Sequence, residues 1–375
     1  MVGDGWLGFV GPPAILVVAA TVGCSSSSGP VRPAVDSGAP DVTVRDAARD
    51  STGATDAVAD TSALDSADEA EAAPPCEHAD GPGACVITLA SAQSAPAGLA
   101  VDSQYVYWTL GQPDGGVFRV PIGGGAIATI ASGQASPLTV ATGAGGVFWA
   151  NSGDDTVMMA PLDGGSPVLL MVAPSAPQSI AVDATSVYVT TAGGTVLSAP
   201  LGGTNGSPTI LASGQGQPGP LALDDAGVYW TNYTGSASVV TVPKVGLADG
   251  GEPLILAANE AQPFAIALDA QHVYWTSLGS GSVRAAPKTG VPDGGAPTIL
   301  ATGQSTPAGV AVDSANVYFT TDTGAGAVLV IPIATGGTPL VLVSNQGYAN
   351  AIVVDATNVY WTDYAASGSV MQVAK

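Results

Sequence analysis

A short aromatic motif recurs seven times along the 375-residue chain, and this repetition constrains the fold more than any other feature. The copies read VYWT, VFWA, VYVT, VYWT, VYWT, VYFT and VYWT, and they begin at Val106, Val147, Val187, Val228, Val273, Val317 and Val359. Consecutive copies start 40 to 45 residues apart. Such a period indicates a repeated supersecondary unit whose neighbouring copies share a continuous core.

Four short strands are expected in each unit. Strand one is an apolar run that ends in aspartate, as in 99–102 (LAVD), and strand two is the aromatic motif itself. Strand three ends near a proline, as in 117–121, and strand four reads TILAS or TILAT, as in 209–213. Glycine-rich turns such as 114–116 (DGG) separate the strands. Short strands with polar turns between them predict an all-β fold.

The two ends of the repeat region complement each other. Residues 86–91 (VITLAS) resemble a strand four with no unit before it, whereas 353–375 contain strands one to three with no strand four. Pairing the two ends completes a seventh unit and removes an exposed strand edge. A solenoid would instead need capping repeats. Residues 86–375 are therefore predicted to form a seven-bladed β-propeller of four-stranded blades, closed by pairing of 86–91 with the C-terminal blade.

The last copy of the motif, 360–363, reads YWTD, and the repeat region resembles the YWTD family of β-propellers. The resemblance covers residues 86–375 and supports the fold. Many members of that family have six blades, and the family's receptor–ligand role is not carried over to this chain. In the other six copies the final aspartate is replaced, by Leu110, Asn151, Thr191, Asn232, Ser277 and Thr321.

The N-terminus resembles a bacterial lipoprotein signal peptide. An apolar run at 14–22 is too short to span a bilayer, and Gly23 and Cys24 follow it. The resemblance implies a signal peptide at 1–23 and lipidation of Cys24, and Ser25 favours the outer membrane. The stretch before the apolar run carries Asp4 and no basic residue, so plain secretion and a cytosolic location remain alternatives.

Residues 24–75 are rich in Ala, Asp, Ser, Thr and Pro. They are predicted to be a disordered tether, because they cannot bury enough apolar surface to offset the entropy of ordering. Cys76 and Cys85 then flank a short loop. Outside the cytoplasm a disulfide between them is the favoured interpretation. Free thiols and a metal site that also uses His78 and Asp80 are the alternatives.

Charge narrows the possible partners. Residues 1–85 hold 13 acidic and three basic side chains, and the remainder holds 17 acidic and five basic. Without a basic surface the chain is not expected to bind nucleic acid or an anionic membrane. Membrane association is therefore expected only through a lipid anchor at Cys24, and a monomer is expected.

Aligning the repeats brings out aspartates at the end of strand one. Their most economical role is structural, because an aspartate that enters a tight turn accepts hydrogen bonds from backbone N–H groups. A set of cation sites is the alternative, but turns related by rotation around a propeller lie far apart, and no metal site is predicted. The six residues are Asp102, Asp183, Asp224, Asp269, Asp313 and Asp355.

A second set of polar residues follows strand four. It is predicted to lie on the face that also carries the strand two–three loops, where propellers usually bind ligands. Either these side chains satisfy backbone groups between blades or they belong to a polar binding face. The set comprises Gln93, Gln134, Gln215, Glu260, Gln304 and Gln346, and the neighbouring loop residues are Asp154, Asp155, Asn232, Tyr233, Asp322, Asp363 and Tyr364.

No catalytic residue or cofactor is predicted. His272 is the sole histidine after residue 78, and no GxSxG nucleophile elbow is present. The favoured function is a non-catalytic propeller outside the cytoplasm that binds protein or carbohydrate through the strand two–three and strand four–one loops. The alternatives are a metal-dependent lyase or hydrolase with a site at the central channel, and a purely structural envelope protein.

Overall fold

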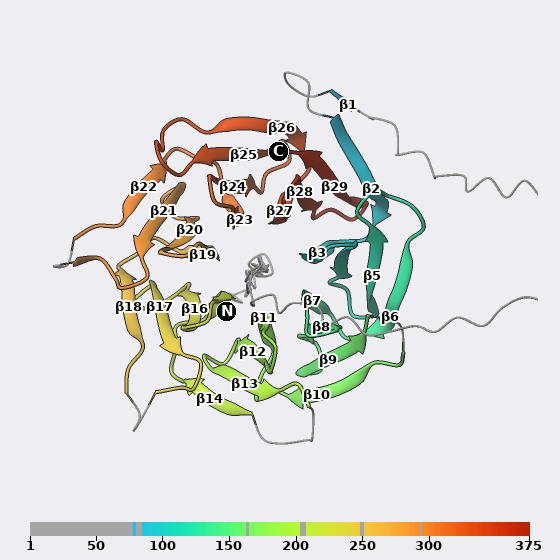
Figure 1. Cartoon of the computed structure of the whole chain (residues 1–375), viewed down its shortest axis with the longest axis horizontal. Coiled ribbons are helices and arrows are strands. Elements are labelled where there is room, and N and C mark those ends of the chain that lie inside the picture. The colour runs from blue at the N-terminus through green and yellow to red at the C-terminus, as the bar shows by residue number, and fades with distance from the viewer. Residues whose placement is uncertain (1–77, 80–84, 163–164, 203–207, 248–250, 293–294) are drawn as a thin grey trace, which may run out of the picture. The chain divides into compact units, whose positions relative to one another are not determined.

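The computed structural model describes residues 78–79, 85–162, 165–202, 208–247, 251–292 and 295–375. Their regular structure is β-strand, arranged in seven antiparallel sheets around a common axis (Figure 1). This confirms the predicted seven-bladed β-propeller. Among the described residues no helix is long and apolar enough to cross a membrane. The expected signal peptide, Cys24 and the tether lie outside the described residues.

Six blades are formed by consecutive strands. Blade 1 comprises β3 (Pro96–Val101), β4 (Tyr105–Leu110), β5 (Gly115–Pro121) and β6 (Ala128–Gln134). Blade 2 comprises β7 (Pro137–Gly143), β8 (Gly146–Asn151), β9 (Thr156–Pro161) and β10 (Val168–Val172). Blade 3 comprises β11 (Pro177–Val182), β12 (Ser186–Thr191), β13 (Val196–Pro200) and β14 (Thr209–Ala212). Blade 4 comprises β15 (Pro218–Leu223), β16 (Gly227–Asn232), β17 (Ser238–Pro243) and β18 (Leu254–Ala258). Blade 5 comprises β19 (Pro263–Leu268), β20 (His272–Ser277), β21 (Ser282–Pro287) and β22 (Thr298–Ala301). Blade 6 comprises β23 (Pro307–Val312), β24 (Asn316–Thr321), β25 (Gly326–Pro332) and β26 (Leu340–Gln346).

Blade 7 joins the two ends of the propeller. It comprises β27 (Ala349–Val354), β28 (Asn358–Asp363) and β29 (Gly368–Ala374), and its outermost full strand is β2 (Cys85–Gln93). Strands β2 and β29 pair antiparallel, with Val86 opposite Val373. A two-residue strand, β1 (His78–Ala79), adds to the outer edge of β2. The predicted closure is therefore confirmed, with β2 slightly longer at both ends than the predicted strand.

The aromatic strand packs between blades because its side chains alternate between two neighbours. The tryptophan side of the strand faces the preceding blade: Trp361 of blade 7 packs with Val328 and Val343 of blade 6. The opposite side faces the next blade, since the Thr320 hydroxyl donates to the backbone carbonyl of Asn350 at 2.7 Å. Trp108, Trp149, Trp230, Trp275 and Trp361 are fully buried.

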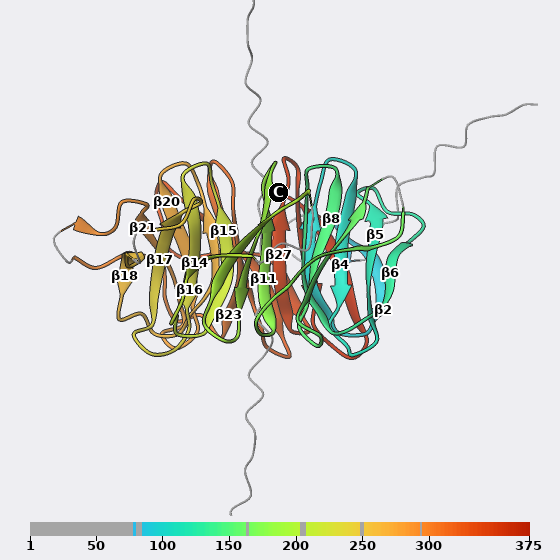
Figure 2. The same cartoon turned by 90° about the horizontal axis from the view of Figure 1, so that it is seen from below.

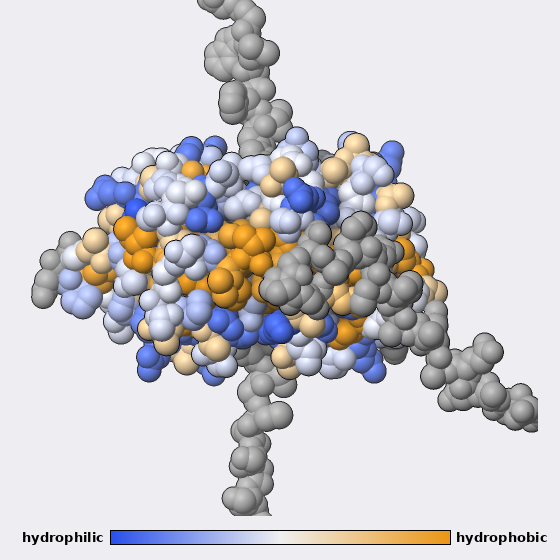
Figure 3. All heavy atoms as spheres, turned by 90° about the horizontal axis from the view of Figure 1, so that it is seen from above, coloured by the Kyte–Doolittle hydropathy of each residue, from blue (hydrophilic) through white to orange (hydrophobic). Residues whose placement is uncertain are grey.

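The outermost strands leave apolar side chains at the rim of the propeller, and orange residues gather around its edge in Figure 3. Each outer strand pairs with its neighbour through an irregular register, as between Val196 and Leu197 in blade 3. Such bulges increase the local twist and discourage pairing with another chain. The exposed rim residues include Val168, Ile210, Ile255, Ile299, Leu340 and Val341.

Candidate functional site

Two sets of loops share one face of the propeller. The strand two–three loops contact the strand four–one loops through backbone hydrogen bonds, from Ser152 N–H to the Ser136 carbonyl at 3.1 Å and from Tyr364 N–H to the Tyr348 carbonyl at 2.9 Å. We call this surface the 2–3 face. The strand one–two turns, which carry the aspartate set, lie at the opposite ends of the strands, and Figure 2 shows the two faces edge-on.

The polar residue after strand four reaches into the boundary with the next blade. The indole N–H of Trp149 in blade 2 donates to the Gln134 carboxamide oxygen at the end of blade 1, at 2.8 Å. Trp108 binds Gln93 at 2.9 Å and Trp361 binds Gln346 at 3.1 Å in the same way. The carboxamide nitrogens donate to the backbone carbonyl two residues earlier. These glutamines therefore hold blade boundaries together, and a role in ligand binding stays a prediction.

Where the tryptophan or the glutamine of the repeat is replaced, the bond between them is replaced or lost as well. Blade 3 has Val189 in place of the tryptophan, and Pro174 stands fifteen positions earlier instead of a glutamine. At blade 4 the bond passes through Asn232, which accepts from Trp230 at 3.1 Å and donates to Gln215 at 3.1 Å. Blade 6 has Phe319 in the tryptophan position. Gln304 consequently faces no indole, although its nitrogen still donates to the Thr302 carbonyl at 2.9 Å.

Glu260, the one carboxylate of this set, lies in a buried ion pair. It is 5% exposed and accepts a hydrogen bond from the Trp275 indole at 2.9 Å. Arg284 on β21 donates to its two oxygens at 3.2 and 3.3 Å. The equivalent of Arg284, opposite the tryptophan on strand three, is methionine in blades 2 and 7. Glutamate and arginine thus replace glutamine and methionine together, since a buried carboxylate needs a cation.

The aspartates at the end of strand one are bound inside their own turns. Oδ1 of Asp183 accepts the backbone N–H groups of Thr185 and Ser186, both at 2.9 Å, and Oδ2 accepts the Tyr188 hydroxyl at 3.0 Å. The same pattern holds in the other five blades with an aspartate, through Tyr107, Tyr229, Tyr274, Tyr318 and Tyr360. Blade 2 lacks both partners, with Gly143 and Phe148 in their places.

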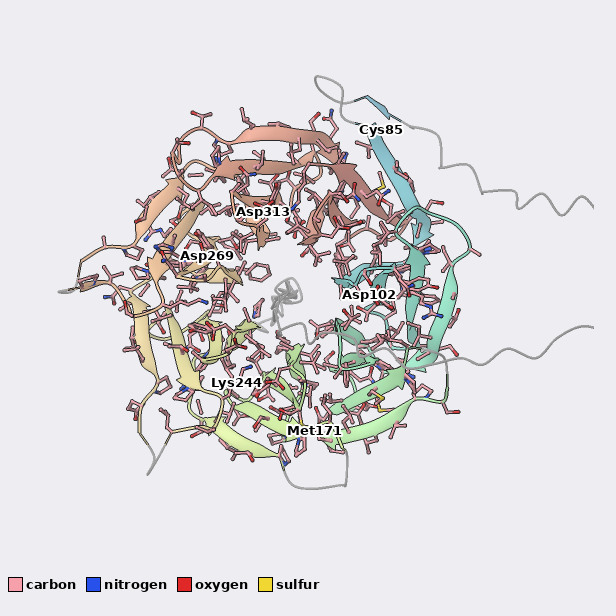
Figure 4. All side chains as sticks on the ribbon, in the orientation of Figure 1. Cys85, Asp102, Met171, Lys244, Asp269 and Asp313 are labelled. Carbon is pink, nitrogen blue, oxygen red and sulfur yellow. The ribbon has the colours of Figure 1, made fainter. Side chains whose placement is uncertain are left out.

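Three of these aspartates also bind a lysine from the next blade. Lys244 contacts Asp183 at 2.9 Å, Lys288 contacts Asp224 at 2.6 Å and Lys375 contacts Asp313 at 2.7 Å. Burial by itself raises the pKa of Asp183, but the bonds from Lys244 and the backbone hold it well below the usual range. Burial and the adjacent carboxylate raise the pKa of Tyr188 to about 12. Asp102, Asp269 and Asp313 belong to separate blades around the ring, so these aspartates do not converge on a common ion (Figure 4).

The loop residues predicted for the 2–3 face fall into two groups. Asp154 is exposed in blade 2 and accepts from the Thr156 hydroxyl at 2.7 Å, and the neighbouring Asp155 has a φ of 63°. Tyr233 of blade 4 accepts from Gln262 at 3.1 Å. Asp154 and Asp155 lie in blade 2 and Tyr233 lies in blade 4, so these residues are two blades apart. The remaining three, Asp322, Asp363 and Tyr364, lie in consecutive blades.

Asp322 of blade 6 and Asp363 and Tyr364 of blade 7 lie at or just after the ends of the aromatic strands β24 and β28, on either side of one blade boundary. Asn350 of β27 bridges toward blade 6, since its Nδ2 donates to Asp322 Oδ2 at 3.3 Å. The Cα atom of its neighbour Ala349 pairs with that of Asp363. Ser369 donates to Asp363 Oδ2 at 3.0 Å, which leaves Asp363 Oδ1 buried without a partner. We call Asp322, Asn350, Asp363 and Tyr364 the 6–7 cluster.

The 6–7 cluster is electrostatically unusual. Burial raises the pKa of Asp322, and burial raises that of Asp363 to about 6 despite the opposing effect of the bond from Ser369. Burial and the charge of Asp322 also raise the pKa of Tyr364. Tyr348, next to Ala349, is 49% exposed and adopts a φ of 62°. Tyr348 therefore places an exposed aromatic side chain next to the cluster, since its backbone carbonyl accepts the Tyr364 N–H.

Sequence reasoning missed Asn350 and Tyr348. The signal that could have found them is departure from the repeat. At the second position of strand one the other blades have Ala97, Leu138, Gln178, Gly219, Phe264 and Ala308. At the position after Tyr348 the other blades have proline, as in Pro96 and Pro307, whereas blade 7 has Ala349.

Among residues 85–375 outside the gaps, no group of three or more His, Cys, Asp or Glu side chains is arranged to hold a metal ion. Cys85 is disulfide-bonded. Cys76 lies outside the described residues, so its pairing with Cys85 stays a prediction. His272 begins β20 on the face opposite the 2–3 face, with Nδ1 3.7 Å from Asp269.

Comparisons with known proteins support the fold alone. No protein-family model and no curated protein matches the chain. A crystal structure of virginiamycin B lyase from Staphylococcus aureus is 12% identical, with a TM-score of 0.64, covering 77% of this chain and 98% of the lyase. A nidogen/laminin complex is 19% identical, with a TM-score of 0.51, covering 64% of this chain and 95% of that chain. The computationally designed Ika8 protein is 18% identical, with a TM-score of 0.55, covering 76% and 98%. Each likeness supports the fold, and the fold does not assign an activity to this chain.

Proposed function

We propose that this protein is a non-catalytic binding propeller of the cell envelope, which binds a protein or carbohydrate through its 2–3 face. The observation that carries the proposal is the 6–7 cluster, where side chains depart from the repeat at one blade boundary. Elsewhere the repeated polar residues have structural partners: Gln93, Gln134 and Gln346 bind tryptophans and the aspartates bind tyrosines. Residues that depart from a repeat without serving its packing are the natural candidates for function.

The chemistry of the face favours an uncharged or cationic ligand. The described residues contain five lysine and arginine side chains, and each has a partner. Three bind aspartates of the opposite face, Arg284 binds Glu260, and Arg119 donates to the Leu162 carbonyl at 2.8 Å. Exposed Tyr348 offers an amphipathic surface of the kind enriched at binding interfaces. A metal-dependent lyase or hydrolase is not favoured, because the repeated carboxylates are already bound to backbone, tyrosine and arginine groups.

Site-specific cross-linking tests this proposal. A photoreactive phenylalanine analogue placed at Tyr348 should capture a partner in cells that produce the protein. The same analogue at Ala184, an exposed turn residue on the opposite face, serves as the matched control. For a carbohydrate partner, Tyr348→Ala should lose glycan-array binding that the unchanged protein shows. Equal capture at both positions, or no capture and no glycan binding, would contradict a ligand on the 2–3 face.

The envelope location rests on the sequence resemblance at Cys24. Metabolic labelling with a fatty acid should label the full chain, and Cys24→Ser should abolish the label and release the protein from the membrane fraction. Unlabelled protein recovered from the medium would support secretion instead.

A further inference from the structure

One carboxylate of the 6–7 cluster, that of Asp322, is desolvated with little to neutralise it. Burial raises its pKa, and it accepts a single side-chain hydrogen bond from the described residues, from Nδ2 of Asn350 at 3.3 Å. The lysine and arginine side chains of the described residues all bind other partners. Glu260 shows the contrast, because that buried carboxylate is paired with Arg284. A desolvated carboxylate of this kind is stabilised by a cation that reaches it from outside.

Asn350 supports this carboxylate at a cost to the fold. The side chain is 1% exposed, and its Oδ1 is buried without a hydrogen-bond partner. Its amide nitrogen donates to Asp322, so the side chain ends beside that carboxylate. Burying an amide oxygen without a donor destabilises a protein, and the other blades have small, apolar or glutamine residues at this position. A residue that breaks a packing rule at one boundary of a repeat is expected where function requires it.

Two tyrosines lie beside Asp322. The charge of Asp322 adds to burial in raising the pKa of Tyr364, which places the phenol near the carboxylate. The backbone N–H of Tyr348 donates at 2.8 Å to the carbonyl of Thr323, the residue after Asp322. The Tyr348 side chain lies along the same loop, since a Cβ atom at Gly324 would be 3.8 Å from its hydroxyl oxygen. The 49% exposed Tyr348 thus presents an aromatic side chain next to the loop that carries Asp322.

The surroundings of Asp322 are otherwise apolar. Its equivalents in the two neighbouring blades are Leu278 and Tyr364, and both pack against the hydrophobic core. A metal ion would need several converging oxygen ligands, and no such group occurs in the described part of the chain. A lysine or arginine side chain suits the site better. Its charged end pairs with a carboxylate, while its aliphatic stem packs on apolar groups and its cation on aromatic rings.

We propose that Asp322 and Tyr348 bind a lysine or arginine side chain of a partner protein at the boundary between blades 6 and 7. The ammonium or guanidinium group donates to the Asp322 carboxylate, and Tyr348 contacts the cation or its stem. Asn350 is a positioning residue that holds the carboxylate. The net charge of the chain, −22, favours the approach of a basic partner. This inference rests on the proposed function, because it names the chemistry of the partner that the 2–3 face binds.

Titration of the full chain with short peptides tests the proposal. The probes are acetylated and amidated Gly-Arg-Gly, Gly-Lys-Gly and Gly-citrulline-Gly, in which citrulline keeps the shape of arginine without its charge. Nuclear magnetic resonance of isotopically labelled tyrosine rings reports binding, and Tyr348→Phe and Tyr364→Phe identify the two signals. Physiological ionic strength screens attraction to the other acidic residues. The two charged peptides should shift these signals with a Kd on the order of 10⁻³ M, and the citrulline peptide should not.

Three variants separate the contributions. Asp322→Asn should weaken binding of the arginine peptide about tenfold, because hydrogen bonds between charged groups are much stronger than neutral ones. Tyr348→Ala should weaken it about two- to fivefold, the effect of an exposed cation–π contact. Asn350→Ala should weaken it without lowering the melting temperature, because it also removes the unpartnered oxygen. Alanine already occupies this position in blades 1 and 6, as Ala97 and Ala308.

Asp154→Asn is the matched control, since Asp154 is an exposed aspartate on the 2–3 face of another blade, and it should leave the affinity unchanged. A cooperative thermal transition confirms that each variant is folded. The proposal is overturned if the charged peptides leave both signals unchanged, if citrulline binds as well as arginine, or if Asp322→Asn binds as tightly as the unchanged protein. Capture of a partner at Tyr348 together with any of these results would support the proposed function and contradict this inference. Charge-dependent peptide binding without any captured partner would support the site and contradict the proposed function.

Discussion

The indole nitrogen of Trp149 lies 2.8 Å from Oε1 of Gln134, so that a strand in blade 2 is bound to the last residue of blade 1. The tryptophan is fully buried, and the glutamine is its hydrogen-bond partner at the blade boundary. In blade 6 the glutamine is kept but the tryptophan is Phe319. The chain thus contains one glutamine with a tryptophan partner, Gln134, and an equivalent glutamine without one, Gln304.

Alanine at these two glutamines should have different effects. Gln134→Ala leaves the buried indole of Trp149 without an acceptor and should lower the free energy of unfolding by about 1–3 kcal/mol. Gln304→Ala removes only a local bond to the Thr302 carbonyl and should change it by less than about 1 kcal/mol. Chemical denaturation monitored by tryptophan fluorescence measures both. Equal losses would contradict a role for the indole bond.

Arg284 should contribute to the free energy of unfolding mainly when residue 260 is a carboxylate. Arg284→Met leaves a buried carboxylate unpaired and should cost about 3–5 kcal/mol of unfolding free energy. Adding Glu260→Gln rebuilds the glutamine, tryptophan and methionine arrangement of blade 2 and should recover most of that loss. Thermal and chemical denaturation of the two single variants and the double variant give the coupling energy. Additive losses would show that the pair acts through packing rather than charge.

The architecture could be predicted because the same strand pattern occurs seven times in the sequence. In addition, the two ends of the repeat region together supply the four strands of one blade. The pairing of 86–91 with the C-terminal blade follows from that pattern alone, and the structure sets its register, with Val86 opposite Val373. The structural roles of the individual polar residues in each repeat were harder to predict. Sequence periodicity places Gln134 near the 2–3 face, but the direction of its side chain toward Trp149 depends on the twist between blades. Asn350 was missed because a single asparagine in an apolar strand has no pattern of its own until the blades are superposed.

Acid should destabilise the propeller through the aspartate set. Burial opposes ionisation of Asp224, but Lys288 and backbone N–H groups lower its pKa, and hydrogen bonds likewise lower those of Asp183, Asp269, Asp313 and Asp355. A group with a lowered folded-state pKa adds stability above its unfolded pKa and loses it as pH falls. The unfolding free energy should therefore drop below about pH 4. Lys288→Met should reduce stability at pH 7 by about 1 kcal/mol and should have less effect at pH 3. A constant effect across this range would argue against charge pairing.

Asp363 should behave in the opposite way. Its pKa is raised to about 6, so its ionised form opposes folding. The resulting penalty is absent below the unfolded pKa, grows as pH rises toward 6 and is constant above it. At pH 7.5, Asp363→Asn should raise the unfolding free energy by on the order of 1–3 kcal/mol, and the gain should vanish near pH 4. Asn232 shows that asparagine fits this position, bonded to Gln215 and Ser238. Denaturant titrations at the two pH values check the sign, and a loss of stability at pH 7.5 would contradict it.

Closure of the ring should depend on β2. Leu89 is buried between the ends of the propeller, whereas Ser91 in the same strand is exposed. Leu89→Ala should lower the unfolding free energy by about 2–5 kcal/mol, and Ser91→Ala by less than about 0.5 kcal/mol. Deleting residues 85–93 should expose the edge of β29 and abolish cooperative unfolding of the whole propeller rather than of one blade. A synthetic peptide of that sequence, added in excess, should restore the cooperative transition by mass action. If the deleted protein melts as sharply and at the same temperature as the full chain, the other six blades hold the ring without β2.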